Sequence, residues 1–99
     1  MPTLSSYSNV YNTAAVWLQR KGYQVWVDEE ADPPLFMAER DGWDFAADSP
    51  VELLGVVAIF EATSPDAYSD YWWRIEGVEI YSGLPVRPVP YVSVMGRGR

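Results

Sequence analysis

The dipeptide Asp41-Gly42 constrains the fold of this chain more than any other feature of its sequence. It lies between two runs of strand-forming residues, 35–40 and 43–48. An Asp-Gly pair in this position predicts a two-residue β-hairpin with a type I′ turn, in which both turn residues need a positive φ. A two-residue loop places Arg40 opposite Trp43, and this pair fixes the register of the whole hairpin.

This register divides the predicted sheet into two faces. Phe36, Ala38 and Phe45 share one face, which we expect to pack into the core. The alternating segment 23–28 predicts a third strand, with its apolar set Tyr23, Val25 and Val27 on that same core face. The opposite face then carries Gln24, Trp26, Asp28, Leu35, Met37, Glu39, Asp44, Ala46 and Asp48.

Two helices are predicted to flank the sheet. Apolar residues recur at spacings of three and four from Leu4 to Leu18, which predicts a helix over 6–21, capped by Ser5 or Ser6 and ended by Gly22. The sequence Ser49-Pro50-Val51-Glu52 is a capping box with proline at the first helical position, and it predicts a buried helix over 50–62. The β-branched residues within 56–60 leave a strand there as the alternative.

The remainder of the chain is rich in aromatic residues and proline. Ser64-Pro65-Asp66 repeats the chemistry of a helix start, so a short helix over 65–72 is expected, and the alternating residues 78–81 suggest a fourth strand. Three prolines in 84–90 predict an extended segment. We therefore expect an α+β fold in a single domain, 1–95, followed by a flexible tail, 96–99.

The composition excludes several classes of function. The chain has 14 acidic and 7 basic residues, a formal charge of −7, and neither His nor Cys. Catalytic triads built on His or Cys and the usual zinc or iron–sulfur sites are thus unavailable. The negative charge opposes binding to a nucleic-acid backbone, and no signal peptide or membrane span is visible. We expect a cytoplasmic protein, of bacterial type in its size, that has no nucleic-acid or membrane partner, no cofactor and no enzymatic activity.

The acidic residues are concentrated in one part of the chain. Residues 28–52 contain a single basic residue, Arg40, and nine acidic ones, namely Asp28, Glu29, Glu30, Asp32, Glu39, Asp41, Asp44, Asp48 and Glu52. These acidic residues do not match the known patterns of a calcium site or of a catalytic carboxylate pair. The loop 28–32 lacks the spacing of a calcium loop, and Glu39 with Asp44, as a glycosidase-type pair, would need a deep cleft. No metal ligands and no catalytic residues are therefore assigned.

The face opposite the core is the predicted binding surface. Its apolar centre of Trp26 and Met37, ringed by carboxylates, has the pattern of a protein-binding patch. Because like charges facing each other are unfavourable, Glu39 and Asp44 must be solvated, or neutralised by Lys21, Arg74 or Arg87, or paired with a partner's cation. Alternatively, residues 84–95 cover Trp26. The candidate partner-binding residues are Trp26, Asp28, Glu29, Glu30, Met37, Glu39, Asp44, Asp48 and Trp73.

Two resemblances accompany these patterns. The order of helix, three strands and helix over 6–62 is similar to the topology of the double-stranded-RNA-binding domain, whose basic motif is missing here, because 49–52 holds no Lys or Arg. Residues 38–62 resemble small acidic bacterial proteins of unassigned function, of the immunity-protein type. That resemblance implies a non-enzymatic module that binds a basic protein. The alternatives are a homodimer formed through exposed Trp26 or Trp73, or a domain that binds a small ligand.

Overall fold

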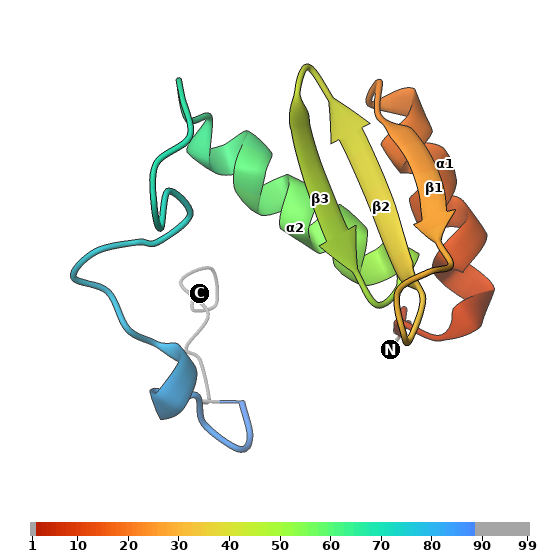
Figure 1. Cartoon of the computed structure of the whole chain (residues 1–99). Helices are drawn as coiled ribbons and strands as arrows, with labels where there is room; N and C mark the ends of the chain where they lie inside the picture. The colour runs from red at the N-terminus through yellow and green to blue at the C-terminus, as the bar shows by residue number, and fades with distance from the viewer. Residues whose placement is uncertain (1, 89–99) are drawn as a thin grey trace.

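Two helices cover one face of a three-stranded antiparallel sheet, and no other part of residues 2–88 covers the opposite face (Figure 1). A computed structural model of the chain describes residues 2–88. Their helices and strands are η1 (Ser8–Val10), α1 (Tyr11–Arg20), β1 (Gln24–Asp28), β2 (Leu35–Arg40), β3 (Trp43–Ala47), α2 (Pro50–Thr63) and η2 (Tyr81–Gly83). The α+β fold predicted from the sequence is confirmed.

The hairpin forms with the predicted turn and register. Asp41 and Gly42 have φ angles of 54° and 85°, as a type I′ turn requires. Ala38 pairs with Phe45, and Glu39 pairs with Asp44. The third strand joins on the other side of β2, where Trp26 pairs with Met37. The division of the sheet into two faces therefore stands as predicted.

The core lies between the sheet and the two helices. Its buried residues are Leu18, Tyr23, Ala38, Phe45, Leu53 and Val57. They come from α1, from the residue just before β1, from β2 and β3, and from α2, and Val25 of β1 packs against them. Val27 points to the same side but stays 43% exposed, because β1 is an edge strand of the described sheet.

The second helix starts at its predicted cap. The hydroxyl oxygen of Ser49 accepts the Glu52 amide at 3.1 Å, and the hydroxyl donates to the Glu52 carboxylate at 3.0 Å. Residues 56–60 lie inside α2, so the strand alternative is wrong, and Val57 is fully buried in the helix. The capping box fixes where α2 begins. The continuous apolar sequence of α2 then packs one side of the helix against the sheet.

The first helix is shorter at its start than predicted. It begins at Tyr11 after a 3-10 turn, and no side chain caps it, so the expected caps Ser5 and Ser6 are wrong. Leu4 and Tyr7 are 84% and 75% exposed, which leaves that part of the apolar stripe without a surface to pack on. A helix gains most of its stability from such packing. The predicted ending is correct, with Gly22 at a φ of 94°.

The segment after α2 departs from the predictions. Residues 65–72 form turns rather than a helix, and Tyr71 has a φ of 60°. The physical reason is the packing of Trp72, whose ring lies 5.6 Å from that of Trp43 and 5.8 Å from that of Phe60. An isolated helix of two turns is marginal in water, so the burial of a large aromatic ring decides the local conformation.

No fourth strand forms within residues 2–88. Residues 78–81 are exposed and form no strand. The nearest regular structure is the 3-10 turn Tyr81–Gly83. Residues 84–88 are exposed and have no regular structure. The rest of the predicted extended segment, the end of the predicted domain at 95 and the tail 96–99 lie outside the described residues. Among the helices of residues 2–88, none is long and apolar enough to cross a membrane.

Candidate protein-binding face

The open face of the sheet brings most of the predicted binding residues together. We call it the acidic face, and its members are Gln24, Trp26, Asp28, Leu35, Met37, Glu39, Asp44 and Ala46. Trp26, Met37 and Ala46 are paired in one row across the three strands, and Trp26 is 40% exposed. The row beside it holds Glu39 and Asp44. An aromatic side chain thus lies half exposed between carboxylates.

Glu39 and Asp44 face each other, and no basic residue of the described part of the chain pairs with them. The Glu39 carboxylate accepts the Gly42 amide at 3.0 Å, so it turns toward the hairpin loop and this lessens its repulsion with Asp44. Among the described residues, neither carboxylate forms an ion pair. Lys21 is paired instead with Glu61 at 2.8 Å, and the Arg74 guanidinium lies 4.2 Å from the centre of the Tyr71 ring.

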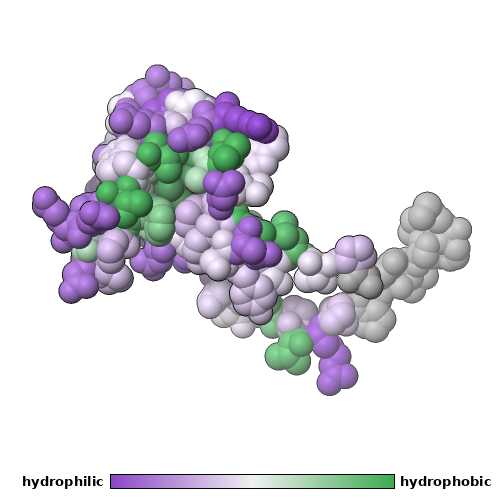
Figure 2. Space-filling view, turned by 90° about the vertical axis from the view of Figure 1, so that its right-hand side faces the viewer, coloured by the Kyte–Doolittle hydropathy of each residue, from purple (hydrophilic) through white to green (hydrophobic). Residues whose placement is uncertain are grey.

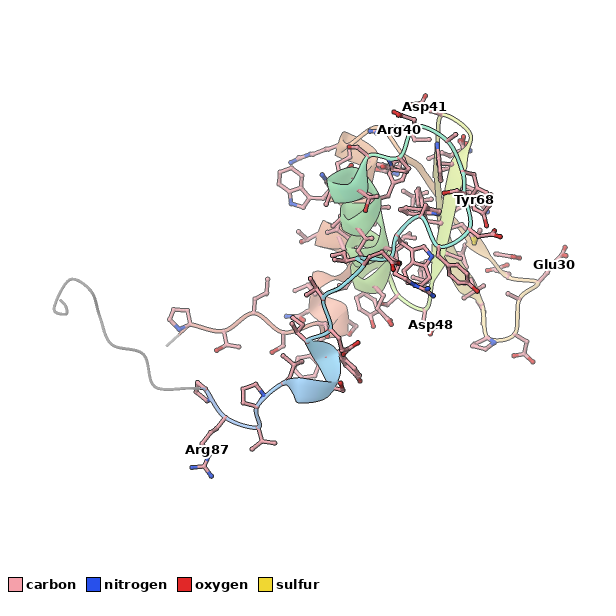
Figure 3. The ribbon with its side chains drawn as sticks, turned by 90° about the vertical axis from the view of Figure 1, so that its left-hand side faces the viewer. Glu30, Arg40, Asp41, Asp48, Tyr68 and Arg87 are labelled. Atoms are coloured by element: carbon pink, nitrogen blue, oxygen red, sulfur yellow. The ribbon has the colours of Figure 1, made fainter. Side chains whose placement is uncertain are left out.

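Arg87 is also placed away from the acidic face. Figure 3 shows it at the far end of the described chain, on the side of the helices. Of the three explanations for the facing carboxylates, neutralisation by Lys21, Arg74 or Arg87 is therefore absent from residues 2–88. Solvation and a partner's cation remain.

The single basic residue of 28–52 points to the other side of the sheet. The Arg40 guanidinium donates to the Lys21 carbonyl at 2.7 Å and lies 4.6 Å from the centre of the Tyr23 ring. Burial raises the pKa of the Tyr23 hydroxyl, the nearby Arg40 opposes this, and Glu61 adds to it. These contacts fix Arg40 on the helix side, which is why the acidic face keeps its negative charge.

The loop between β1 and β2 extends the acidic face at one end. Its Glu30 lies at the protruding end of the loop, and Asp48 lies beyond β3 (Figure 3). Asp28 accepts the Glu30 amide at 3.1 Å, so one carboxylate serves to shape the loop. Glu29 and Glu30 are exposed. Within residues 2–88, no group of three or more carboxylates is placed to hold a metal ion.

Trp73 does not belong to this face. It lies in the segment after α2, where its ring is 6.0 Å from that of Tyr71 and the Arg74 guanidinium is 5.8 Å from its centre. Trp73 is 50% exposed, whereas Trp72 is half-buried on the core. The predicted set of binding residues is thus divided between two surfaces.

Sequence reasoning missed an apolar groove on the helix side. It is lined by Leu4, Val10, Ala14, Trp17, Val51 and Leu54 and has a volume of about 370 Å³. The signal was present in Trp17, which lies beside the buried stripe of α1, but the groove needs two helices and the N-terminal segment to meet. A sequence pattern does not show that meeting.

Comparison of the chain with protein-family models, curated proteins and solved structures finds no match. The resemblances noted in the sequence stay predictions, and we infer a function from the geometry of the acidic face.

Proposed function

We propose that the chain is a non-enzymatic interaction module that binds a basic protein partner through the acidic face. One observation carries the proposal. Trp26 lies half exposed on the edge strand β1, with Glu39, Asp44 and Asp28 on the same open face of the sheet and Arg40 held on the other face. By this proposal the protein acts as an immunity-type inhibitor in the cytoplasm.

The chemistry of the face suits such a partner. Trp is enriched among the residues that dominate binding energy, and it is most effective where surrounding contacts exclude water. Carboxylates around it attract a cationic surface and raise the association rate, an effect that weakens as salt is added. A basic partner would also relieve the repulsion between Glu39 and Asp44, because it supplies the missing cation.

The proposal is tested with a panel of small basic nucleases as probes. Association rates are measured at low and at physiological salt with the intact chain and with the double variant Glu39→Gln, Asp44→Asn. We expect the double variant to associate about tenfold more slowly at low salt and to lose most of the salt dependence. Trp26→Ala should weaken binding by roughly 30-fold, mainly through faster dissociation.

A matched control separates the face from the overall charge. Asp66 and Asp70 are exposed and lie after α2, so Asp66→Asn with Asp70→Asn removes the same charge away from the acidic face. This control should bind like the parent protein. The proposal fails if no basic nuclease binds at low salt, or if the control slows association as much as the face variant does.

A further inference from the structure

The helix side of the molecule carries an apolar groove that no described residue fills. It lies between the N-terminal segment, α1 and the first turns of α2, and its lining includes Leu4, Trp17 and Leu54. Leu4 is 84% exposed and Trp17 is 49% exposed. Figure 2 looks onto α1 and β1 and shows hydrophobic residues lying open between hydrophilic ones on this side. Apolar surface of this kind marks a place for a partner.

The same chain carries a second apolar surface without a partner. Residues 75–88, which we call the arm, run away from the sheet and both helices (Figure 1). The arm's large apolar side chains are exposed by 58% or more, and they are Ile75, Val78, Ile80, Tyr81, Leu84 and Val86. Single exposed apolar residues are common on protein surfaces, but six within one short segment are not.

We propose that the protein forms a dimer in which the arm of each copy lies in the groove of the other. The groove needs an apolar, extended occupant, and the arm is one that the chain itself supplies. The exchange is reciprocal, so it has twofold symmetry and closes at two copies. It also uses a surface on the opposite side of the sheet from the acidic face, which stays free for another protein.

The structure keeps the arm away from the groove of its own chain. Trp72 anchors the start of the segment on Trp43 and Phe60, next to the end of α2. The groove, in contrast, is lined by Val51 and Leu54 in the first turns of the same helix. The rise of the helix puts Phe60 about 9 Å beyond Leu54, and the chain then runs on away from the helix (Figure 1). From this anchor the arm points outward, where a second copy can meet it.

The charges around the two surfaces are complementary. The Arg20 guanidinium lies 5.5 Å from the centre of the Trp17 ring, at the groove. The arm carries Glu76 and Glu79 between its apolar residues. The Glu79 carboxylate accepts the Ser82 amide at 3.1 Å, which lowers the pKa of Glu79 and orders the turn that presents Ile80. The cation of Arg20 and the two carboxylates of the arm, which outnumber its one cation Arg87, favour contact between copies.

The area available is large enough for a stable dimer. Successive side chains of an extended segment point to opposite sides, so about three of the six enter the groove, which has a volume of about 370 Å³. Burying a large apolar side chain removes on the order of 100 Å² from water, so each arm buries roughly 300 Å² and the groove surface beneath it a similar area. Two reciprocal contacts then bury about 1,200 Å² in total, which is the lower end of the range for stable protein–protein interfaces.

Sedimentation of the full chain tests the proposal. We expect the parent protein to be a dimer at micromolar concentration. Leu4→Asp in the groove and Ile80→Asp in the arm should each raise the dimer dissociation constant by at least about 100-fold. Both residues are highly exposed, so these variants should fold, and circular dichroism checks that they do. Thr3→Asp is the matched control, because it adds the same charge beside Leu4 at an exposed residue outside the groove.

Mixing the two variants distinguishes arm exchange from other dimers. The Leu4→Asp chain keeps an intact arm and the Ile80→Asp chain keeps an intact groove, so a mixed dimer retains one of its two contacts. We expect the mixture to dimerise about tenfold more tightly than either variant alone. The proposal is overturned by a monomeric parent at high concentration, by dissociation of the Thr3→Asp control, or by a mixture that behaves like its components.

The acidic face and the arm are tested independently. The double variant Glu39→Gln, Asp44→Asn should leave the dimer intact, and Leu4→Asp should leave binding to a basic nuclease intact. A failure to dimerise therefore leaves the proposed nuclease binding unaffected, and a failure to bind nucleases leaves the proposed dimer unaffected.

Discussion

At the scale of single residues, Arg40 decides how charge is divided between the two sides of the sheet. It pairs with Trp43 next to the hairpin turn, and its side chain extends toward α1, where the Lys21 carbonyl and the Tyr23 ring hold it. Lys21 is in turn paired with Glu61. These contacts hold two of the chain's seven basic residues on the helix side, and within residues 2–88 the acidic face carries no cation of its own.

The same group of residues gives a prediction about alkaline pH. Burial raises the pKa of Tyr23 above its ordinary value of 10.0, Arg40 opposes this, and Glu61 adds to it. The folded protein therefore holds the Tyr23 proton more tightly than the unfolded chain does. The stability from this group is fully present below about pH 10 and is lost as the pH rises through the folded-state pKa.

Urea unfolding at about pH 8 and about pH 11 measures the effect. The fall in unfolding free energy between the two pH values should be smaller in Tyr23→Phe than in the parent protein, because the variant has no hydroxyl to ionise there. An equal fall in both proteins would contradict the prediction.

At the scale of elements, each correctly predicted boundary has a local chemical cause. The Asp41-Gly42 turn needs two positive φ angles, and the capping box Ser49–Glu52 satisfies the first amides of α2. The wrongly predicted boundaries have no such cause. The start of α1 depended on a stripe from Leu4 to Leu18 whose first residues find nothing to pack against.

Two glycine substitutions should have opposite effects on stability. A Cβ added at Gly42 or Gly55 meets no atom within 4 Å, so steric conflict with neighbours is absent at both. Gly42 has a φ of 85°, and Ala there should cost about 1 kcal/mol of unfolding free energy. Gly55 is inside α2, and Ala there should add about 0.5–1 kcal/mol. Denaturant midpoints measure both, and a shift of the same sign in the two variants would refute the assignment.

The caps give a second prediction at this scale. Ser49→Ala should lower the unfolding free energy by about 1 kcal/mol, because it removes the oxygen that accepts the Glu52 amide. Ser5→Ala and Ser6→Ala should each change it by less than about 0.5 kcal/mol, since neither residue caps α1. Thermal unfolding of the three variants checks this. A loss of unfolding free energy at Ser5 or Ser6 similar to that at Ser49 would show that the helix starts as early as the sequence predicted.

At the scale of the whole molecule, one aromatic cluster joins the C-terminal segment to the two-layer core. Trp72 lies against Trp43 and Phe60, and the Tyr68 ring is 6.4 Å from that of Trp43. Trp43 comes from the hairpin and Phe60 from α2, so the cluster connects three regions that are distant in sequence. It also determines from which point the arm leaves the molecule.

Adjacent tryptophans should therefore differ sharply on substitution. Trp72→Ala should lower the unfolding free energy by about 2 kcal/mol, less than for a fully buried ring, because Trp72 is half-buried. Trp73→Ala should lower it by less than about 0.5 kcal/mol, because that ring is half exposed and contacts Tyr71 and Arg74 rather than the core. Chemical denaturation of both variants decides this, and equal losses would place Trp73 in the core.

Much of the acidic face could be predicted because a hairpin has a strict geometry. Once the turn type was fixed, the two-residue period of a strand assigned Trp26, Met37, Glu39 and Asp44 to one face. Trp73 could not be placed in the same way. Its position depends on which of two neighbouring tryptophans finds a hydrophobic surface, and that surface is made of residues from other elements.

The sequence by itself determined the turn, the strand register, the second helix and the concentration of acid in 28–52, because each depends on neighbours along the chain. Only the tertiary structure decided the rest. It bound Arg40 to the Lys21 carbonyl, replaced a helix over 65–72 by turns that dock Trp72, and formed a groove from two helices and the N-terminal segment. Each of these outcomes is set by burial and contact between distant segments, where the gain from packing exceeds local preference.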